Sequence, residues 1–232
     1  MKLRFLGLGS AFNPAMENTN AFFLSGNELY LLDCGESAFG RIYDLKVLNN
    51  CSRITVAITH LHCDHIGSLG SLISYCAIVL KKPIRVIHPL ETVRSLLDLM
   101  GIVRSGYSWL PSLGPEKAEA VSFRPIEIEH VDNMRCYGYI VSDSEKTIYF
   151  SGDAKFIPPE VIDAFHKGEV DEIYQDSSLE TGDHATHGSF KQMEESFAPE
   201  FRSRVYCIHL DKDYRETIRA AGFKVPEPEF GF

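Results

Sequence analysis

The sequence predicts an α/β protein whose strands carry polar side chains at their carboxyl ends. The run 53–59 is apolar and β-branched, as a buried strand is, and residues 66–73 after it can open a helix. Later runs at 123–129, 146–150 and 204–208 are also strand-like, and a His or an Asp closely follows each of them. Because open α/β sheets place their sites at the carboxyl ends of strands, we expect these polar residues to lie together.

Composition indicates one domain over residues 1–232. The chain is 44% hydrophobic, is long enough to bury a substantial core, and has no Pro/Gly/Ser-rich linker that would divide it. Its six cysteines show no Cys-x-x-Cys spacing, so we expect free thiols rather than disulfides. The net charge of −9 opposes a protein that must bind a long polyanion, because such binding draws on clustered Lys and Arg.

The amino-terminal residues predict a first strand rather than a targeting signal. Residues 1–6 interleave charged and apolar side chains and lack the apolar core of a signal peptide. The longest apolar region, Leu69 to Leu80, is too short to span a bilayer and contains Ser71, Ser74 and Tyr75. We therefore expect a cytoplasmic protein with no membrane partner.

The loop after the first predicted buried strand is the strongest sign of chemistry in the chain. It holds three imidazoles and a carboxylate within six residues, at His60, His62, Asp64 and His65. In an extended segment alternate residues share a face, so His60 and His62 can bind one ion, while Asp64 and His65 turn toward a second position. Imidazole and carboxylate ligands suit zinc, and they also suit manganese or iron.

Further candidate ligands follow the later strands. They are His130, Asp153 and His209, and Asp153 stands on a Ser-Gly-Asp turn where the backbone can approach an ion closely. Each of these residues taken singly would usually be a cap or a turn residue. Together with the loop they indicate a site for two divalent ions.

The series His-x-His-x-Asp-His at 60–65, followed by His130, Asp153 and His209, resembles the metallo-β-lactamase-fold hydrolases in order and over nearly the whole length. The resemblance implies an αββα sandwich, in which two packed sheets are flanked by helices. It also implies an enzyme.

The resemblance assigns a role to each ligand. One metal would be held by His60, His62 and His130. The other would be held by Asp64, His65 and His209. Asp153 would bridge the two metals, and Asp33 would orient ligand histidines.

The RNase Z-like branch of these hydrolases is the closer match, judged by the motifs at 5–11, 33–36 and 59–66. Where RNase Z carries His-Glu-Ala, this chain has residues 174–178, with Asp176 at the Glu position. Downstream, residues 184–189 fit that branch's His-small-Ser/Thr motif. His187 is then expected as the catalytic histidine outside the metal shell, and His184 remains its competitor.

Two divalent ions would lower the pKa of a bridging water, so that a hydroxide serves as nucleophile near neutral pH. His187 would protonate or stabilise the leaving oxygen, and Asp176 behind it would orient the ring. Asp176 could instead be an ordinary turn residue after a strand. The expected catalytic residues are Asp64, Asp176 and His187, with His184 as the alternative to His187.

The lack of a basic arm in the sequence indicates a small substrate. Residues 101–114 are short and aromatic, whereas RNase Z enzymes carry a Gly-rich, basic arm that grips transfer RNA. The chain is more similar to small cyclic-mononucleotide phosphodiesterases of the anti-Pycsar type, which implies a small phosphodiester substrate and a homodimer. Transfer-RNA 3′ processing is the first alternative and hydrolysis of a lactone or thioester the second.

Several aromatic side chains could stack on a base, although such rings more often belong to a core or a dimer contact. They are Tyr107, Trp109, Phe223, Phe230 and Phe232.

Overall fold

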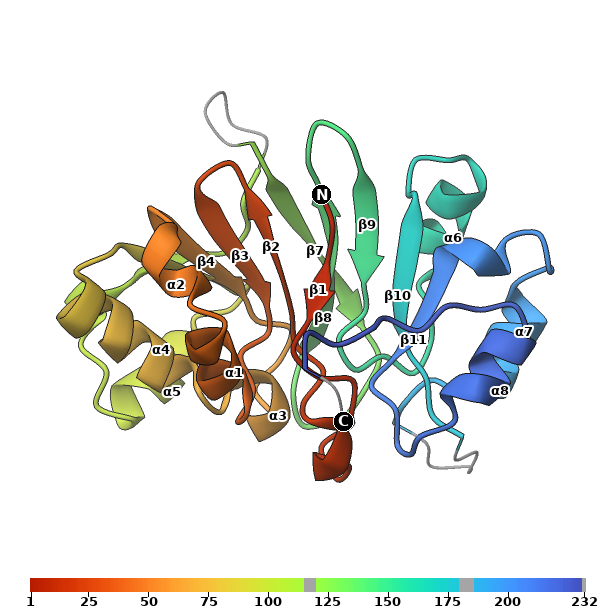
Figure 1. Ribbon diagram of the computed structural model, residues 1–232, viewed down its shortest axis with the longest axis horizontal. Coiled ribbons are helices and arrows are strands. Elements are labelled where there is room, and N and C mark those ends of the chain that lie inside the picture. Colours follow the sequence, from red (N-terminus) through yellow and green to blue (C-terminus); the bar gives the residue numbers. More distant parts are fainter. Residues whose placement is uncertain (115–119, 180–185, 231–232) are drawn as a thin grey trace.

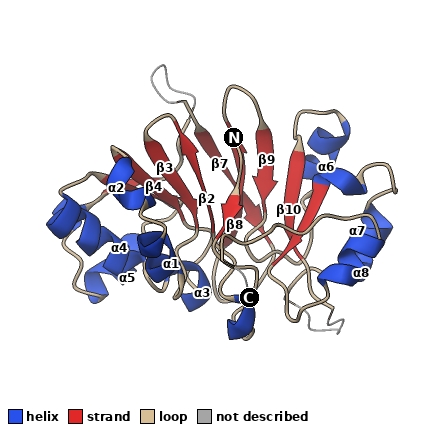
Figure 2. Ribbon diagram, viewed as in Figure 1, coloured by secondary structure: helices blue, strands red, loops and turns tan. Residues whose placement is uncertain are grey.

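Two β-sheets pack face to face and helices cover the outer face of each, as the computed structural model shows (Figure 1, Figure 2). The structure describes residues 1–114, 120–179 and 186–230. The predicted αββα sandwich is confirmed.

The first sheet has strand order β1-β2-β3-β4-β5-β6. Its strands are β1 (Arg4–Phe5), β2 (Ala21–Ser25), β3 (Glu28–Leu32), β4 (Arg53–Ala57), β5 (Ile84–Ile87) and β6 (Ser108–Leu110). From β3 to β6 every neighbouring pair is parallel. The predicted strand at 53–59 thus pairs only as far as Ala57, and its last residues lead into the histidine loop.

The second sheet has strand order β11-β10-β9-β8-β7. Its strands are β7 (Ser122–Ile128), β8 (Cys136–Ser142), β9 (Thr147–Phe150), β10 (Glu172–Asp176) and β11 (Val205–Ile208). Strands β9, β10 and β11 are parallel, and β7 runs in the same direction because β8 is antiparallel to both β7 and β9. The carboxyl ends of these four strands therefore open on the same edge.

Helices cover the two outer faces. Over the first sheet lie α1 (Ala38–Asp44), α2 (Val47–Asn50), α3 (Cys63–Ile66), α4 (Leu69–Ser74) and α5 (Thr92–Leu99). Over the second sheet lie α6 (Pro159–His166), α7 (Phe190–Ser196) and α8 (Arg215–Ala220). A capping box starts α7, because the Ser189 hydroxyl accepts from the Gln192 backbone and the Gln192 side chain accepts from the Ser189 backbone.

Aromatic rings fill the space between the sheets. Phe23 stacks on Tyr30 with ring centres 5.0 Å apart, and Tyr30 stacks on Phe123 of the other sheet at 5.9 Å. The hydroxyl of Tyr139 on β8 donates to the Ile58 carbonyl, 2.9 Å away, beyond the end of β4. Both kinds of contact fix one sheet relative to the other.

One helical stretch in the described residues, Cys63–Leu80, is long and apolar enough to cross a membrane by length and composition alone. It combines α3, α4 and a π-helix over Tyr75–Leu80. Its residues Leu69, Leu72 and Ile73 are buried against the first sheet. A core helix passes the same test, so the stretch is weak evidence for a membrane span.

Candidate metal centre

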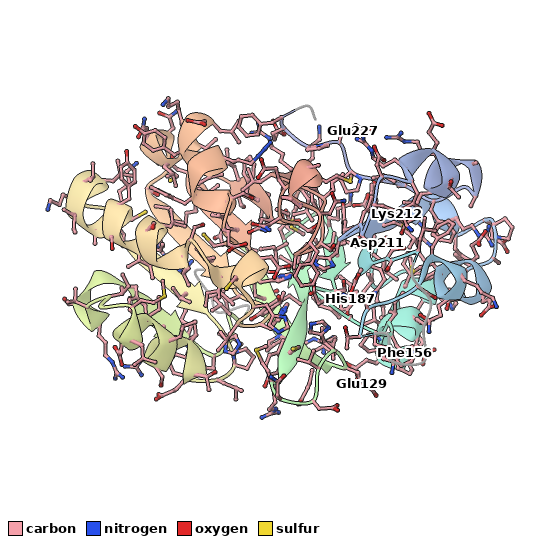
Figure 3. All side chains as sticks on the ribbon, turned by 90° about the horizontal axis from the view of Figure 1, so that it is seen from below. Glu129, Phe156, His187, Asp211, Lys212 and Glu227 are labelled. Atoms are coloured by element: carbon pink, nitrogen blue, oxygen red, sulfur yellow. The ribbon has the colours of Figure 1, made fainter. Side chains whose placement is uncertain are left out.

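The seven predicted ligands meet at the edge where the strands' carboxyl ends open. The loop after β4 contributes four of them, and the other three follow β7, β9 and β11. They are His60, His62, Asp64, His65, His130, Asp153 and His209. Figure 3 views the molecule from below, onto this edge, and shows His187 and Asp211 there.

The first cluster joins three imidazoles and one carboxylate oxygen. Nε2 of His60 lies 2.9 Å from Nδ1 of His62, which lies 3.4 Å from Nε2 of His130. The Oδ2 atom of Asp153 lies 3.7 Å from His60 Nε2 and 3.6 Å from His130 Nε2. Ring nitrogens that converge in this way suit one cation between them.

The second cluster uses the other oxygen of the same carboxylate. Oδ1 of Asp153 lies 3.0 Å from Nε2 of His65 and 3.2 Å from Nε2 of His209. Oδ2 of Asp64 lies 3.1 Å from His65 Nε2 and 3.2 Å from His209 Nε2. The atoms therefore divide as the resemblance implied, with Asp153 between the two groups.

Gly152 lets Asp153 reach this position. Its φ of +60° is left-handed, and a Cβ there would lie 2.7 Å from the Cβ of Thr59. Glycine avoids both the strain and the clash.

Asp33 and Thr59 orient the histidines from behind. Asp33 Oδ2 lies 2.8 Å from Nδ1 of His65, and its two oxygens accept from the backbone N–H and the hydroxyl of Thr59. The Thr59 hydroxyl also lies 3.1 Å from Nδ1 of His60. With each Nδ1 held, the Nε2 lone pairs of His60 and His65 face the centre.

Two non-glycine residues at the site have a left-handed backbone. Asp33 has a φ of 65° and His209 a φ of 57°. Such conformations cost free energy and persist where the surroundings fix them, as they do beside ligand side chains.

The charges and burial of the centre fit divalent cations. Asp33, Asp64 and Asp153 are all less than 5% exposed, which is costly for carboxylates without a counter-charge. Burial would raise the pKa of Asp153, but the charges of His209 and His65 outweigh it and hold the pKa well below its usual range. Burial and the charge of His65 lower the pKa of His60 well below its usual value, which keeps that imidazole neutral and able to ligate.

Unpartnered atoms point to the same conclusion. Among the described residues, Nε2 of His65 and Oδ1 of Asp153 are fully buried and have no hydrogen-bond partner. Buried polar atoms are normally satisfied, so a cation bound between these two atoms would fit the site. The residues present thus fit the divalent metals that the fold family implies.

His187 lies beside the clusters rather than within either ligand group. Its Nδ1 is 2.7 Å from Oδ2 of Asp176, and its ring lies 4.8 Å from that of His130 and stacks at 5.0 Å on that of His209. Asp176 is fully buried, whereas the His187 side chain is 32% exposed. Within the described residues no hydrogen bond reaches Nε2 of His187, and the residue lines the cavity beside the clusters. His184, its predicted competitor, lies outside the described residues.

A cavity of about 850 Å³ opens over the centre. No Lys or Arg lines it in the part of the chain that the structure describes. Its lining consists of ligand residues, His187, two further acids and small or apolar residues: Ser10, Ala11, Phe12, Glu36, His62, Cys63, Asp64, His130, Val131, Asp153, Ser178, Thr186, His187, His209 and Asp211.

Among the described residues, none of the aromatic side chains singled out in the sequence lines this cavity. Tyr107 and Phe223 are buried in the core, and the Trp109 indole donates to the His88 carbonyl. Phe230 lies under the Arg41 guanidinium, and Phe232 is outside the described residues. Sequence reasoning instead missed Phe12, since one aromatic between polar and small residues gives no periodic signal.

Comparisons with known proteins agree with this architecture. The model of the family described as Anti-Pycsar protein Apyc1 matches residues 1–225. The chain is 28% identical to the Anti-Pycsar protein Apyc1 of Bacillus phage 010DV004 over 96% of this chain and 93% of that protein. It is also 32% identical to the Ribonuclease Z of Methanococcus maripaludis, over 62% of this chain and 46% of the enzyme. The metallo-beta-lactamase fold protein YhfI from Bacillus subtilis superimposes with a TM-score of 0.73 at 15% identity, covering 99% and 97% of the two chains.

The Asp33 contacts lead to a prediction about metal affinity. Asp33→Asn keeps the size of the side chain, and asparagine tolerates the left-handed backbone. The amide of the new side chain can no longer accept from both Thr59 and His65. We expect metal affinity to fall roughly 10- to 100-fold, as is typical when an orienting partner is lost. Competition with a chelator measures it, with Asp98→Asn on the exposed face of α5 as the control. Equal affinity in both variants would show that Asp33 does not orient His65.

Proposed function

The chain belongs to the Anti-Pycsar protein Apyc1 family, and from this we propose that it hydrolyses 3′,5′-cyclic mononucleotides with two zinc ions. It is a metal-dependent hydrolase with the metallo-β-lactamase fold. One observation carries the dinuclear part of the proposal: the two oxygens of Asp153 face two separate sets of ligand atoms.

Bound divalent ions would neutralise the phosphate and make an activated water available as nucleophile. His60, His62 and His130 would hold one ion, and Asp64, His65 and His209 the other. In this scheme Asp153 would be a ligand of both ions.

His187 would act on the leaving oxygen. Burial by itself lowers the pKa of His187, but the charge and hydrogen bond of Asp176, with the charge of Asp153, outweigh burial and raise the pKa. A protonated imidazole with a free Nε2 can donate to the oxygen that leaves phosphorus. Asp176 can orient the His187 ring because its own carboxylate is held by other residues. That carboxylate accepts from the Ala154 N–H and lies 3.5 Å from His209 Nδ1.

The cavity supports a small substrate. It is large enough for a mononucleotide, since ligand pockets for molecules of that size occupy about 300–1,000 Å³. Its described lining contains no Lys or Arg, while Glu36 and Asp211 add negative charge. A long polyanion would gain little binding energy there.

Transfer-RNA 3′ processing is the second candidate function. The match to the Methanococcus maripaludis Ribonuclease Z favours it, because that enzyme shares 32% identity with this chain. The cavity's charge weighs against it.

We also propose that the chain acts as a cytoplasmic homodimer.

The shared position of Asp153 gives the first test. Elemental analysis of protein purified without chelator should find two divalent ions per chain. Asp153→Ala should lose metal and lower turnover by orders of magnitude, because two cations would then repel each other without the carboxylate between them. Asp153→Asn should do nearly as much damage. Near-normal turnover of either variant with a full metal content would exclude the bridge, and wild-type activity with one ion or none would exclude a dinuclear centre.

The second test concerns His187. Replacement by Ala should lower turnover roughly 10²- to 10⁴-fold while both ions are retained, as is expected on loss of a positioned acid. His166→Ala on the exposed end of α6 is the control, and His184→Ala tests the competitor. A larger loss at His184, or metal loss at His187, would reverse the assignment.

The pH profile should follow from the raised pKa of His187. An acid acts in its protonated form, so activity should decline as pH rises through that pKa. Asp176→Asn removes the charge that raises the pKa, so this decline should move to lower pH.

The third test compares substrates under identical metal and salt conditions. The ratio of kcat/KM for 3′,5′-cyclic AMP to that for precursor transfer RNA should greatly exceed one, because it compares transition-state stabilisation directly. Efficient 3′ trimming of transfer RNA with cyclic nucleotides left intact would replace the leading proposal with the ribonuclease. Hydrolysis of a lactone alone would favour carbon-ester chemistry.

A further inference from the structure

Phe12 is the most exposed of the large apolar side chains in the described residues, with 97% of its surface accessible. A single exposed apolar residue is ordinary on a protein surface. Phe12 differs in its place, because it lines the cavity over the metal centre. Apart from imidazoles it is the only aromatic side chain in the described lining.

The loop that carries Phe12 is fixed to the second metal cluster. The Ser10 N–H and the Asn13 side-chain amide both donate to the carbonyl of Leu210, each at 3.1 Å. The Asn13 N–H donates back to the Ser10 carbonyl at 3.0 Å, which closes the loop around Phe12. Leu210 directly follows His209, so the position of the ring is tied to that of a candidate ligand.

Beneath the exposed ring the loop is anchored in the core. Met16, in the 3₁₀ turn Pro14–Met16, is only 3% exposed and belongs to the core between the sheets. The Leu8 N–H donates to the Met16 carbonyl at 2.9 Å. The backbone that carries the ring is therefore held in place before a ligand arrives, which reduces the entropy lost on binding.

The lining of the rest of the cavity makes the Phe12 ring important for substrate affinity. The metal clusters and His187 account for a phosphodiester, but the part of the substrate beyond the phosphate finds no Lys or Arg in the described lining. Glu36 and Asp211 disfavour additional phosphates there. Apolar contact with a flat, uncharged group remains.

We propose that Phe12 is the platform on which the nucleobase of the substrate stacks. The proposal rests on the cyclic-nucleotide function proposed above, and deepens it by assigning the base to one wall of the cavity. Every base has a π face, so a single ring gives affinity with a preference for the larger purines rather than reading the base edge.

The other exposed phenylalanine near the centre provides a matched control. Phe156 is 48% exposed and lines a different recess, beside Gln192 and Met193. Figure 3 labels it on the face that also carries His187. Phe156→Ala therefore removes the same ring from the same side of the molecule without touching the metal cavity.

The test uses the metal-loaded enzyme with two substrates, 3′,5′-cyclic AMP and base-free ribose 3′,5′-cyclic phosphate. Phe12→Ala should raise KM for cyclic AMP roughly 5- to 150-fold, the range for loss of one base–aromatic stack, and leave KM for the base-free substrate unchanged. Phe12→Trp should keep KM for cyclic AMP near the wild-type value. Phe12→Leu should raise it, as Phe12→Ala does. Phe156→Ala should behave as wild type.

Binding without turnover gives an independent readout. Calorimetric titration with a non-hydrolysable cyclic AMP phosphorothioate should show the same loss of affinity in Phe12→Ala, with the metal content unchanged.

Each other outcome overturns the proposal in a recognisable way. Equal losses on both substrates would mean that Phe12 shapes the metal centre. No loss on either would leave the ring without a role in binding, and a loss at Phe156 alone would place the base in the other recess. A change of oligomeric state in Phe12→Ala would make the ring a subunit contact. If the wild-type enzyme neither binds nor hydrolyses any cyclic nucleotide but processes another diester, the proposed function itself fails.

Discussion

The carboxylate of Asp153 holds the arrangement of the site together. It is 2% exposed, and its two oxygens lie near imidazole nitrogens from both sheets, those of His60 and His65 from the first and those of His130 and His209 from the second. An isolated carboxylate at this depth would cost several kcal/mol, so the residues around it must supply positive charge. His65 and His209 do so only in part, because Asp64 and Asp33 bring further negative charge. This balance of charge fits bound cations, and the two left-handed residues, Asp33 and His209, stand beside or among the candidate ligands.

The sandwich explains how so many ligands reach that point. Parallel pairing from β3 to β5 places Asp33 and the histidine loop at one edge of the first sheet. Parallel pairing from β9 to β11 places Asp153, Asp176 and His209 at the matching edge of the second. Since each cluster takes side chains from both sheets, a bound ion joins them, and metal binding is thereby coupled to the packing of the sandwich.

Sequence reasoning was accurate where chemistry is local. The histidine loop has the spacing of metal ligands and the strand before it has an unambiguous apolar pattern, so the residues alone predicted where a metal site lies, while the sandwich fold and the full grouping of the ligands came from the family resemblance. Residue spacing alone says less where long-range geometry decides. The pairing of Asp176 with His187 was expected from the resemblance and is found at 2.7 Å, but it depends on β10 ending beside the loop after it, which no spacing encodes. The length of the first strand was also overestimated, because only Arg4 and Phe5 find a partner in β2.

The absence of basic side chains from the described cavity wall then links composition to specificity. An enzyme that grips a long polyanion spreads its binding energy over many phosphate contacts, each of which needs a Lys or Arg. Here the described cavity wall offers no Lys or Arg, and the acids Glu36 and Asp211 line it. Under the proposed function, a substrate with a single diester would gain the attraction of the bound ions and avoid the repulsion that further phosphates would meet. Under that proposal, the acidic wall would disfavour substrates with further phosphates, and any preference among small diesters would come from the uncharged surfaces beside the ions.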